Sequence, residues 1–576
     1  MVDGVIRLKM KKIIFPLLIV LCLSACTKDL TDYYIRLDHR ETANKELEKK
    51  NKELREQNEA QEQWNKALAE MNARLELEAE ELSRKIDSLE VAMAVVVPVV
   101  PKLRQIEFVT NDNPMLSENL TCEIIGDSVI ECWLPMITTE KYLIPRFTFD
   151  GTLVTIDGME AESGSSMFDF KAPVTVTVHT SEQTDNYRMY VHSYTGLPIM
   201  RIDTEGGQPI ISKEEYINAH LSLTEDIRTR GPGDVLEADL QIKGRGNSTW
   251  VRWPKKPYRL KFFDKVSLFG EHKDRSWVLI ANYADKSALR NHAALYMGKI
   301  SNLDYTSSSH FVDLILNGRY DGTYEVCEKI KISNHRVAVG DDGFLLEVDN
   351  RVQYEGGPDA RYFFTPHMTC PISIEDPDVE IDDENFCYVR DYVYTADEVL
   401  YSEIFRDPDI GWRHYFDMDS FVDWYLINEI THNPDATMLY SCFMHLKRGG
   451  KITMGPIWDF DLAFGNTDYW DRGPYDFWIR KSDWILRMFK DPVFVTRVKE
   501  RYDYFYDRKY DIMREIDETA VYLKRSAQEN EDRWHTFYHY VLPNYDIWGS
   551  YYNEVQSVKE WLNARMDWLK EQFDKM

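Results

Sequence analysis

The sequence predicts a multidomain protein: a helical stalk, an all-β sandwich, and a larger α+β domain with a helical C-terminal cap. Three observations support this prediction. Leucines recur every seven residues between Leu47 and Leu89, as in a coiled coil. Over 102–200 the hydrophobic period changes to two, which is typical of β-strands. Strand-like and helix-like segments then mix from 201 onward, and 470–576 is helical in pattern and rich in tryptophan.

The composition is that of an acidic globular protein. Of 576 residues, 69 are Lys or Arg and 97 are Asp or Glu, which gives a formal net charge of -28. Such a chain is poorly suited to nucleic acid, because phosphate backbones need cationic faces. Hydrophobic residues make up 44% of the chain, and 15 Trp, 34 Tyr and 26 Phe supply ample core material. The composition therefore excludes a wholly disordered protein.

The first 25 residues have the pattern of a lipoprotein signal peptide. A basic stretch that ends at Lys12 precedes an apolar run over 13–23, which is too short to span a bilayer comfortably. The following Leu-Ser-Ala-Cys resembles a bacterial lipobox. That resemblance implies cleavage before Cys26, lipidation of its thiol, and a lipid-anchored protein of the bacterial outer membrane, periplasmic or at the cell surface. An ordinary signal peptide or a buried helix is the alternative.

Of the eight cysteines, six remain after the signal segment and the lipobox cysteine are set aside. Disulfides are permitted outside the cytoplasm, and the local candidates are Cys122 with Cys132 and Cys370 with Cys387. The spacing does not determine the pairing, and free buried thiols are the alternative.

Residues 26–101 are predicted to form a coiled-coil stalk and its linker. The leucine repeat is broken only by Gln61, and the facing heptad position is asparagine at 44, 51, 58, 65 and 72. A sustained heptad predicts a coiled coil, and therefore a homo-oligomer, in which such asparagines fix register at a cost in stability. The valine- and proline-rich segment 95–101 ends the helix, because proline cannot continue it. A single solvated helix is the alternative.

Residues 102–200 are predicted to form a β-sandwich. Valine alternates with threonine over 174–178, and 187–192 alternates in the same way. Short alternating runs separated by Asn, Asp and Gly indicate a sandwich of roughly 100 residues. It resembles the immunoglobulin-like modules that precede catalytic domains in lipoproteins of Bacteroidetes. Because it carries no visible catalytic cluster, we expect a spacer or binding module.

The segment 455–466 is the first candidate site and reads Gly-Pro-Ile-Trp-Asp-Phe-Asp-Leu-Ala-Phe-Gly-Asn. In an extended strand, Asp459 and Asp461 point to one face and Phe460 to the other. Two carboxylates fixed in this way can hold Mg²⁺, which keeps water and substrate phosphate in its remaining positions. Gly465 would let the chain turn away. The alternative is a buried strand whose acids cap turns or pair with arginines.

A basic candidate lies upstream. The segment 243–250, Lys-Gly-Arg-Gly-Asn-Ser-Thr-Trp, contains a Gly-x-Gly turn that can present successive backbone N–H groups to an anion. Arg245 and Asn247 are therefore candidate cofactor-binding residues. In the strand that follows, Arg259 and Lys261 share one face, where the lysine could reach phosphates. A simple hairpin turn and a solvated basic strand are the alternatives.

Two acidic candidates complete the set. Asn-Gly at 317–318 is a strong hairpin signal, and it leads to Glu328, which could pair with a strand lysine or lie at the surface. Asp435 follows a predicted helix and lies 24 residues before Asp459, across what looks like a hairpin closed at 448–450. That arrangement can bring a base-type aspartate close to a metal-binding one. A turn-forming aspartate after proline is the alternative.

Together these segments resemble the CotH family, named for a spore-coat protein kinase. Four ordered motifs over about 200–575 carry the resemblance: Gly-Arg-Gly-Asn-Ser-Thr-Trp with Lys-Lys-Pro-Tyr-Arg-Leu-Lys-Phe, Asn-Tyr-Ala-Asp-Lys-Ser, Leu-Asn-Gly-Arg-Tyr-Asp-Gly-Thr-Tyr and Gly-Pro-Ile-Trp-Asp-Phe-Asp. The resemblance implies an atypical protein-kinase-like fold for 201–576. It further implies transfer of the γ-phosphoryl of ATP to protein side chains with Mg²⁺.

The resemblance also implies roles for single residues. Kinases contribute mostly position and charge to phosphoryl transfer. Lys261 then corresponds to the phosphate-binding lysine and Glu328 to its partner. Asp435 corresponds to the catalytic base, and Asp459 to the metal ligand, supported by Asp461.

The sequence departs from the kinase pattern at one position. Kinase catalytic loops carry a metal-binding asparagine five residues after the aspartate, and here that position is Tyr440. A phenol is a poor Mg²⁺ ligand, although Asn433 or Asp461 could take its place. The leading expectation is a lipid-anchored extracytoplasmic kinase acting on proteins. The alternative is a non-catalytic, pseudokinase-like display or adhesion module that binds a protein or glycan.

Overall fold

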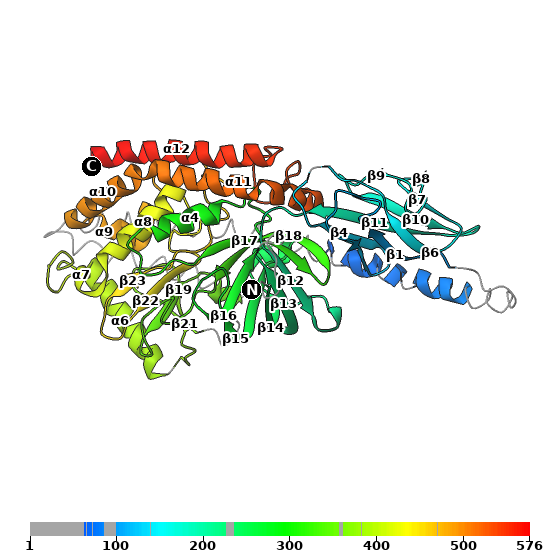
Figure 1. Ribbon diagram of the computed structural model, residues 1–576. Coiled ribbons are helices and arrows are strands. Elements are labelled where there is room, and N and C mark those ends of the chain that lie inside the picture. Colours follow the sequence, from blue (N-terminus) through cyan, green and yellow to red (C-terminus); the bar gives the residue numbers. More distant parts are fainter. Residues whose placement is uncertain are drawn as a thin grey trace, which may run out of the picture. The chain divides into compact units, whose positions relative to one another are not determined.

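The computed structural model describes residues 63–64, 66–71, 73–75, 77–85, 100–138, 140–225, 235–355, 361–381, 383–468 and 471–576 (Figure 1). The chain divides into two compact units, Met1–Pro98 and Val99–Met576. The predicted signal peptide 1–25, the lipidation site Cys26 and most of the predicted stalk lie outside the described residues. No helix in the described ranges combines the length and apolar character needed to cross a bilayer.

The described part of the first unit, between 63 and 85, is helical. Leu68, Leu75 and Leu82 belong to the predicted heptad row, and they are 41%, 56% and 60% exposed. Ion pairs four residues apart, such as Arg74 with Glu78 at 2.9 Å, lie along the helix and add little stability each. The coiled coil itself stays a prediction.

The second unit begins with two β-sheets around one apolar core. The smaller sheet has the order β2 (Leu120–Thr121), β1 (Lys102–Phe108), β6 (Arg146–Asp150). The larger has the order β3 (Glu123–Ile125), β4 (Val129–Leu134), β11 (Thr184–Ser193), β10 (Val174–His179), β7 (Leu153–Ile156), β8 (Met159–Glu160). A separate pair joins β5 (Tyr142–Leu143) to β9 (Phe168–Asp169).

The predicted alternation is present in β10 and β11. Val174, Val176 and Val178 are buried, and the threonines between them are half-buried. Val174 pairs with Met189 in the antiparallel register, so buried side chains from both strands meet on one face. The comparison of this sandwich with immunoglobulin-like modules stays a prediction. All six cysteines outside the signal segment and Cys26 are free thiols.

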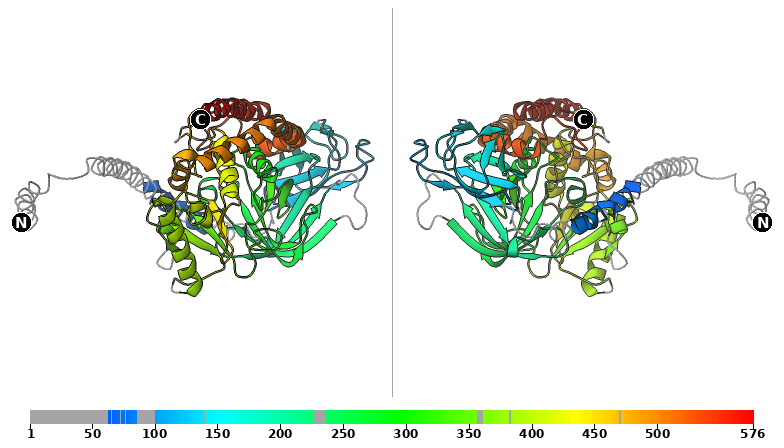
Figure 2. Two further views of the ribbon diagram at one scale, coloured as in Figure 1. Left: turned by 90° about the vertical axis from the view of Figure 1, so that its left-hand side faces the viewer. Right: turned by 90° about the vertical axis from the view of Figure 1, so that its right-hand side faces the viewer.

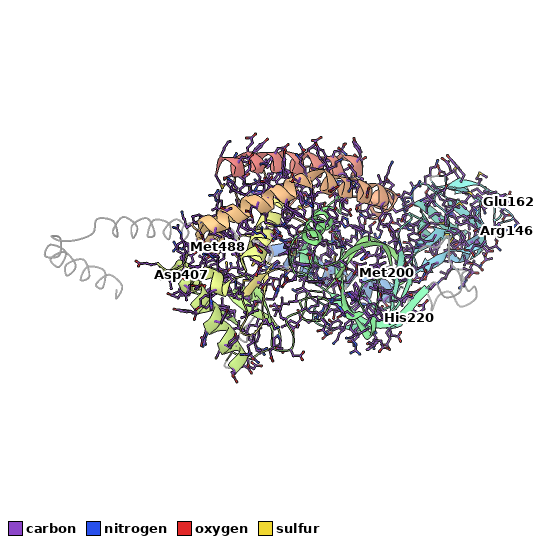
Figure 3. The ribbon with its side chains drawn as sticks, turned by 60° about the vertical axis from the view of Figure 1, so that its left-hand side comes forward. Arg146, Glu162, Met200, His220, Asp407 and Met488 are labelled. Carbon is purple, nitrogen blue, oxygen red and sulfur yellow. The ribbon has the colours of Figure 1, made fainter. Side chains whose placement is uncertain are left out.

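A closed barrel follows the sandwich. Its strands run in the order β12 (Ile199–Thr204), β13 (Ile217–Thr224), β14 (Val235–Gly244), β15 (Tyr258–Val266), β16 (Asp274–Ile280), β18 (Arg319–Glu328), β17 (Ser309–Leu316). Buried residues such as Met200, marked in Figure 3, and Trp277 fill its core. The predicted hairpin is confirmed: Asn317 and Gly318 have positive φ and connect β17 to β18.

A second sheet and the helices complete the unit. The sheet has the order β20 (Tyr362–Phe363), β21 (Ile372–Asp376), β19 (Phe344–Val348), β22 (Cys442–Leu446), β23 (Ile452–Met454). Short helices are η1 (Glu205–Gly207), α3 (Ser248–Arg252), α5 (Val352–Glu355), α7 (Trp412–Tyr415), η2 (Ile479–Lys481) and α9 (Asp483–Met488). Longer ones are α4 (Arg290–Lys299), α6 (Glu384–Tyr401), α8 (Met418–Thr431), α10 (Pro492–Asp507), α11 (Lys509–Trp534) and α12 (Tyr551–Lys575).

The C-terminal helices cover one side of this unit. The orange and red helices α10, α11 and α12 lie side by side in Figures 1 and 2. Asp491 caps α10 by accepting a hydrogen bond from the N–H of Val493, and Pro492 occupies the first turn. Trp484 of α9 is fully buried among the helices. Helix α8 runs through the core, and nearly all of its residues are buried.

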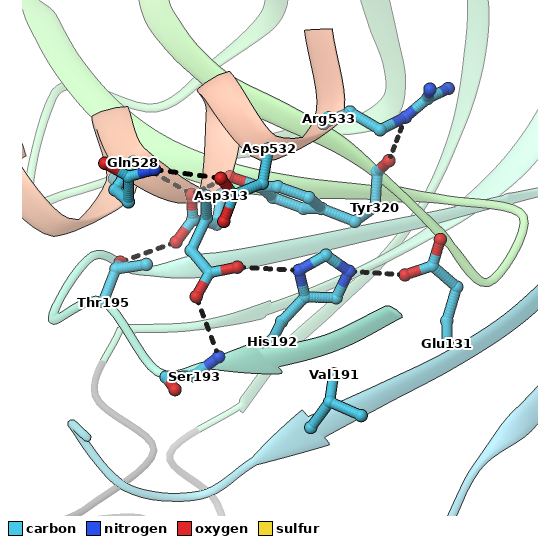
Figure 4. A network of polar contacts seen from close by, with 12 residues as sticks. Glu131, Val191, His192, Ser193, Thr195, Asp313, Tyr320, Gln528, Asp532 and Arg533 are labelled. Carbon is cyan, nitrogen blue, oxygen red and sulfur yellow. Dashed lines mark hydrogen bonds and ion pairs between the residues drawn. The ribbon is translucent and has the colours of Figure 1, made fainter. Parts of the chain in front are cut away.

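Buried hydrogen bonds join the sandwich to α11 (Figure 4). Glu529 of α11 accepts from Ser193 N at 3.1 Å, Lys141 Nζ at 3.0 Å and His192 Nδ1 at 2.9 Å. His192 Nε2 donates to Glu131 at 2.6 Å. Burial by itself would lower the pKa of His192, but hydrogen bonds to both glutamates outweigh it and raise the pKa to about 9. The imidazole therefore carries a proton on each nitrogen at neutral pH.

A second group of bonds connects the same helix to the barrel. Asp313 of β17 accepts from Thr195 Oγ1 at 2.6 Å, Ser526 Oγ at 2.7 Å and Tyr320 Oη at 3.0 Å. Sandwich, barrel and α11 thus share one buried polar network, whose members fix their relative positions.

Candidate functional site

A polar cavity of about 460 Å³ lies where the barrel meets the five-stranded sheet. The barrel contributes the loop after β14 together with parts of β15, β16 and the segment after it. The sheet contributes residues of β19, β21 and β22, and the segment after β23 closes the cavity. Arg245, Asn247, Asp459 and Asp461, predicted from the sequence, all line it.

The aspartates are not on a strand. The strand β23 ends at Met454, residues 455–466 form an irregular loop, and Asp459 has a φ of 66°. The expectation of an extended segment is therefore wrong. The expectation that both carboxylates face one site is compatible with the structure, because Asp459 and Asp461 line the same cavity.

Asparagine side chains hold this loop. Asn433 Nδ2 donates to Asp459 O at 3.1 Å, and Asn466 Nδ2 donates to Asp461 O at 2.7 Å. Between them, Asn291 Oδ1 accepts from the N–H of the buried Phe460 at 2.7 Å. The backbone is fixed by tertiary contacts, which leaves the two carboxylates to line the cavity.

The carboxylates repel each other. Burial raises the pKa of Asp461 well above its usual range, and the charges of Asp459, Asp435 and Asp285 add to the effect. A bound cation would relieve this repulsion. The described residues hold no cluster of three or more His, Cys, Asp or Glu suited to a metal. Two carboxylates fit Mg²⁺, which needs only one or two plus substrate phosphates.

Two arginines provide the cationic side of the cavity. Arg245 lies over the ring of Trp458 at 5.5 Å, and its pKa is lowered by burial while Asp459 opposes that effect. Arg259 of β15 lines the cavity, and its buried Nε has no hydrogen-bond partner among the described residues. Because the Arg259 side chain lines the cavity, its positive charge can help to bind an oxyanion there.

Lys261 and Asn247 occupy different positions relative to the cavity. Lys261 is exposed, and its Nζ lies 5.7 Å from the centre of the Tyr216 ring, outside the cavity wall. Residues two apart on a strand share a face but lie roughly 7 Å from each other, so Arg259 reaches the cavity and Lys261 does not. Asn247 lines the cavity, and its Oδ1 accepts from Lys213 Nζ at 3.2 Å.

Glu328 has a different partner from the strand lysine expected for it. Its Oε1 accepts from Arg336 Nε at 3.3 Å. Its Oε2 accepts from Tyr305 Oη at 3.1 Å and from Ser308 N at 3.3 Å. The side chain is buried, so Glu328 is neither a surface glutamate nor the ion-pair partner of Lys261.

Asp435 lies close enough to Asp461 to raise the pKa of that carboxyl, although it does not line the cavity itself. Its N–H donates to Asn433 Oδ1 at 3.3 Å. Because Asn433 also bonds Asp459 O, its amide is occupied by loop contacts. Tyr440 lies under the guanidinium of Arg351, 5.1 Å from the ring centre.

An acidic wall was not anticipated from the sequence. Glu347 and Asp349, in and just after β19, and Glu375 of β21 line the cavity. Burial raises the pKa of Glu347 well above its usual range, and Glu375 adds to the effect. Arg351 forms a bidentate pair with Asp349, in which Nε donates to Oδ1 and Nη2 donates to Oδ2. The signal available was an acid inside an apolar strand pattern, as in Leu-Leu-Glu-Val-Asp over 345–349.

The fold and this cavity define a mixed α/β protein whose site combines paired carboxylates with arginines. The family model described as CotH kinase protein matches residues 242–569. This match spans more than half of the chain, and the chain belongs to the CotH kinase family. The resemblance identified from the motifs is thereby confirmed.

Other comparisons add little. No curated protein matches the chain. A solved structure from Bacteroides thetaiotaomicron, described as a "putative glycoside hydrolase", is 14% identical and covers 51% of this chain and 89% of its own. Its TM-score is 0.15, so this likeness carries no argument about fold or function.

Proposed function

We propose that this chain is a lipid-anchored extracytoplasmic protein kinase that transfers the γ-phosphoryl of ATP to protein side chains. The observation that carries the proposal is the cavity, which Asp459 and Asp461 line together with Arg245 and Arg259. Its volume of about 460 Å³ falls within the range of small-molecule sites, about 300–1,000 Å³. Membership of the CotH kinase family supports the same activity.

The residues have separate tasks in this proposal. Asp459 and Asp461 would hold Mg²⁺, which when bound neutralises phosphate charge. Arg245 and Arg259 orient the phosphates by charge-assisted hydrogen bonds. Asp435 accepts the proton of the substrate hydroxyl. The lipidated Cys26 and the stalk attach the enzyme to the outer membrane, where its substrate would be another extracytoplasmic protein.

The test is thermal unfolding of the full chain with and without Mg-ATP, alongside a phosphoryl-transfer assay. Ligand at 100 times its Kd stabilises a protein by about 2.7 kcal/mol, so the unfolding midpoint should rise. Asp459→Asn should abolish the rise, and Asp435→Asn should retain it but lose transfer. Asp409→Asn removes one exposed carboxylate elsewhere and serves as the matched control. An unchanged midpoint in the wild-type protein would contradict the proposal.

A second candidate is a nucleotide-binding pseudokinase that displays or binds a surface protein or glycan. Tyr440 favours it, because a phenol packed against Arg351 stands where kinases place a metal-binding asparagine. This candidate predicts the Mg-ATP shift and its loss in Asp459→Asn, with no phosphoryl transfer by the wild-type protein.

A further inference from the structure

A second cavity, of about 260 Å³, lies where the loop 455–466 meets the C-terminal helices. The end of this loop, the connection between α11 and α12, and the first half of α12 form much of its wall. It shares no lining residue with the larger cavity described above. Its volume is that of about nine liquid waters, which leaves room for a ring-sized group.

Aromatic side chains form the apolar part of the wall. The rings of Phe464 and Trp561 meet edge to face, with centres 5.9 Å apart. Trp548 also lines the cavity and is 44% exposed, and within the described ranges its indole stacks on no other aromatic ring and no cation. An exposed indole at the wall of a cavity offers a flat apolar surface on which a ring-shaped ligand can stack.

The charged side chains of this cavity are largely paired. Arg472 Nη1 donates to Asp546 Oδ2 at 2.7 Å, and Arg290 pairs with the buried Asp285. Burial raises the pKa of Glu554 to about 7, so this carboxyl carries only part of a negative charge at neutral pH. With so little net charge, the cavity favours an uncharged ligand over a phosphate or a metal ion.

Arg472 and Asp546 retain accessible hydrogen-bonding groups. Their side chains are 38% and 41% exposed, and the bond between them uses one of the guanidinium N–H donors and one of the carboxylate oxygens. The guanidinium lies 3.7 Å from the centre of the Tyr545 ring, which holds it in place. A fixed guanidinium beside a carboxylate presents donors and acceptors side by side, as neighbouring hydroxyl groups require.

A sugar ring combines the two properties that this cavity matches. Its C–H groups give it an apolar face for the indole of Trp548, and the hydroxyl groups around its rim both donate and accept hydrogen bonds. Tyr538 and Tyr540, on the same connection between helices, are 70% and 52% exposed. Exposed aromatic rings beyond the cavity suit a chain of several sugars, because further rings can stack on them.

We propose that this cavity binds an uncharged saccharide, such as a segment of a surface glycan. One sugar ring stacks on Trp548, and its hydroxyl groups bond to Arg472 and Asp546. The proposal does not rest on phosphoryl transfer, because saccharide binding here requires neither ATP nor Asp459.

Isothermal titration calorimetry on the full chain tests the proposal with four uncharged hexasaccharides: cellohexaose, maltohexaose, mannohexaose and N-acetylchitohexaose. We expect at least one of them to bind. Trp548→Ala should weaken that binding about tenfold, because the stacking surface is lost. Trp548→Phe keeps an aromatic ring and should retain most of the affinity, which separates the loss of stacking from a change in fold.

The matched control is Trp64→Ala, which removes an exposed tryptophan from the helix of the first unit and should leave the affinity unchanged. The proposal is overturned if none of the four saccharides binds, or if Trp548→Ala binds them as tightly as the wild type does. It is also overturned if Trp64→Ala causes the same loss, or if only the charged hexasaccharide hexagalacturonate binds.

Discussion

Arg259 and Lys261 show how two residues on one face of a strand can differ in function. The sequence predicted Lys261 as the phosphate-binding residue, but Arg259 lines the cavity and Lys261 does not. Lys261 instead lies near Tyr216 in solvent. The distinction depends on where β15 meets the cavity, which local sequence does not reveal.

The first prediction compares these two residues. Arg259→Gln should weaken Mg-ATP binding about tenfold to a hundredfold, because a charged hydrogen bond contributes about 1.5–3 kcal/mol. Lys261→Gln removes the same charge two residues away and should change the affinity by less than about twofold. Isothermal titration calorimetry on the full chain measures both. If both variants lost the same amount of affinity for Mg-ATP, the phosphates would be bound by both residues of β15 and not by Arg259 in particular.

Gly465 is the residue that ends the aspartate loop. Its φ is 73°, and a Cβ there would lie 2.7 Å from Trp561 Nε1 and 2.8 Å from Arg472 O. The expectation that the chain turns away at this glycine is confirmed. The indole of Trp561 in α12 also lies close to Gly465, a contact that the sequence did not indicate.

The second prediction is that Gly465→Ala destabilises the protein by about 2–4 kcal/mol, from backbone strain and steric overlap together. Gly449→Ala is the control, since Gly449 has a φ of 72° but a Cβ added there would meet no heavy atom within 4 Å. It should cost only about 1–2 kcal/mol. Urea unfolding of both variants measures the difference in their free energies of unfolding. Equal destabilisation would show that Trp561 can move away from the added Cβ at little cost.

Among the elements, α11 connects distant parts of the second unit. Glu529 holds the sandwich, and the next residue, Asn530, accepts from Lys255 Nζ at 2.8 Å and from Thr323 N at 3.2 Å. Trp253 and Pro257, on either side of Lys255, line the larger cavity. One turn of this helix therefore contacts both the sandwich and the segment that shapes the site.

The third prediction concerns pH. The pKa of His192 is raised from 6.5 to about 9 in the folded protein, so its contribution to stability is fully present below about pH 6.5. It is lost as pH rises through about 9, and it amounts to about 3 kcal/mol at most. The free energy of unfolding of the wild type minus that of His192→Gln should shrink accordingly between pH 6 and 10.

Urea unfolding at several pH values measures this difference, and taking the difference removes the contribution of other titrating groups. His220→Gln is the control, because His220 also contacts two carboxylates but is exposed, so solvent screens its pairs. A difference that stays constant with pH would show that His192 is not protonated in the folded protein.

The elements differ in how far the sequence predicts them. The hairpin at 317–318 and the alternation in β10 follow from local chemistry and are present. The strand expected at 455–466 is absent, because Asn291, Asn433 and Asn466 bond its backbone from distant segments. An alternating apolar and acidic pattern is compatible with a strand and with an irregular loop, and here tertiary contacts determine which one forms.

The same limit applies to the site. Family motifs located the aspartates and the Gly-Arg-Gly loop, because their chemistry is local. The partner of Glu328 could not be predicted, since Arg336 reaches it from a loop eight residues later. Glu347 and Glu375 come from separate strands that only the sheet brings together. Contacts of that kind depend on strand order, which spacing does not specify.

At the scale of the whole molecule, the stalk yields the fourth prediction. The exposed Leu75 and Leu82 belong to a heptad row that a coiled coil would bury. The full chain should therefore self-associate, and Leu75→Lys/Leu82→Lys should return it to a monomer. Light scattering coupled to gel filtration measures the mass. The control is Leu77→Lys, which makes the same substitution at an exposed leucine outside the heptad row and should leave the oligomer intact.

The buried joint at His192 and Glu529 also determines how force passes through the second unit. Because Glu529 of α11 is bonded to Lys141, His192 and Ser193 of the sandwich, a force on the sandwich is transmitted to α11 through these bonds. Arg146 and Glu162 mark the far end of the sandwich in Figure 3. A partner that holds the sandwich there would therefore also orient the cavity relative to that partner.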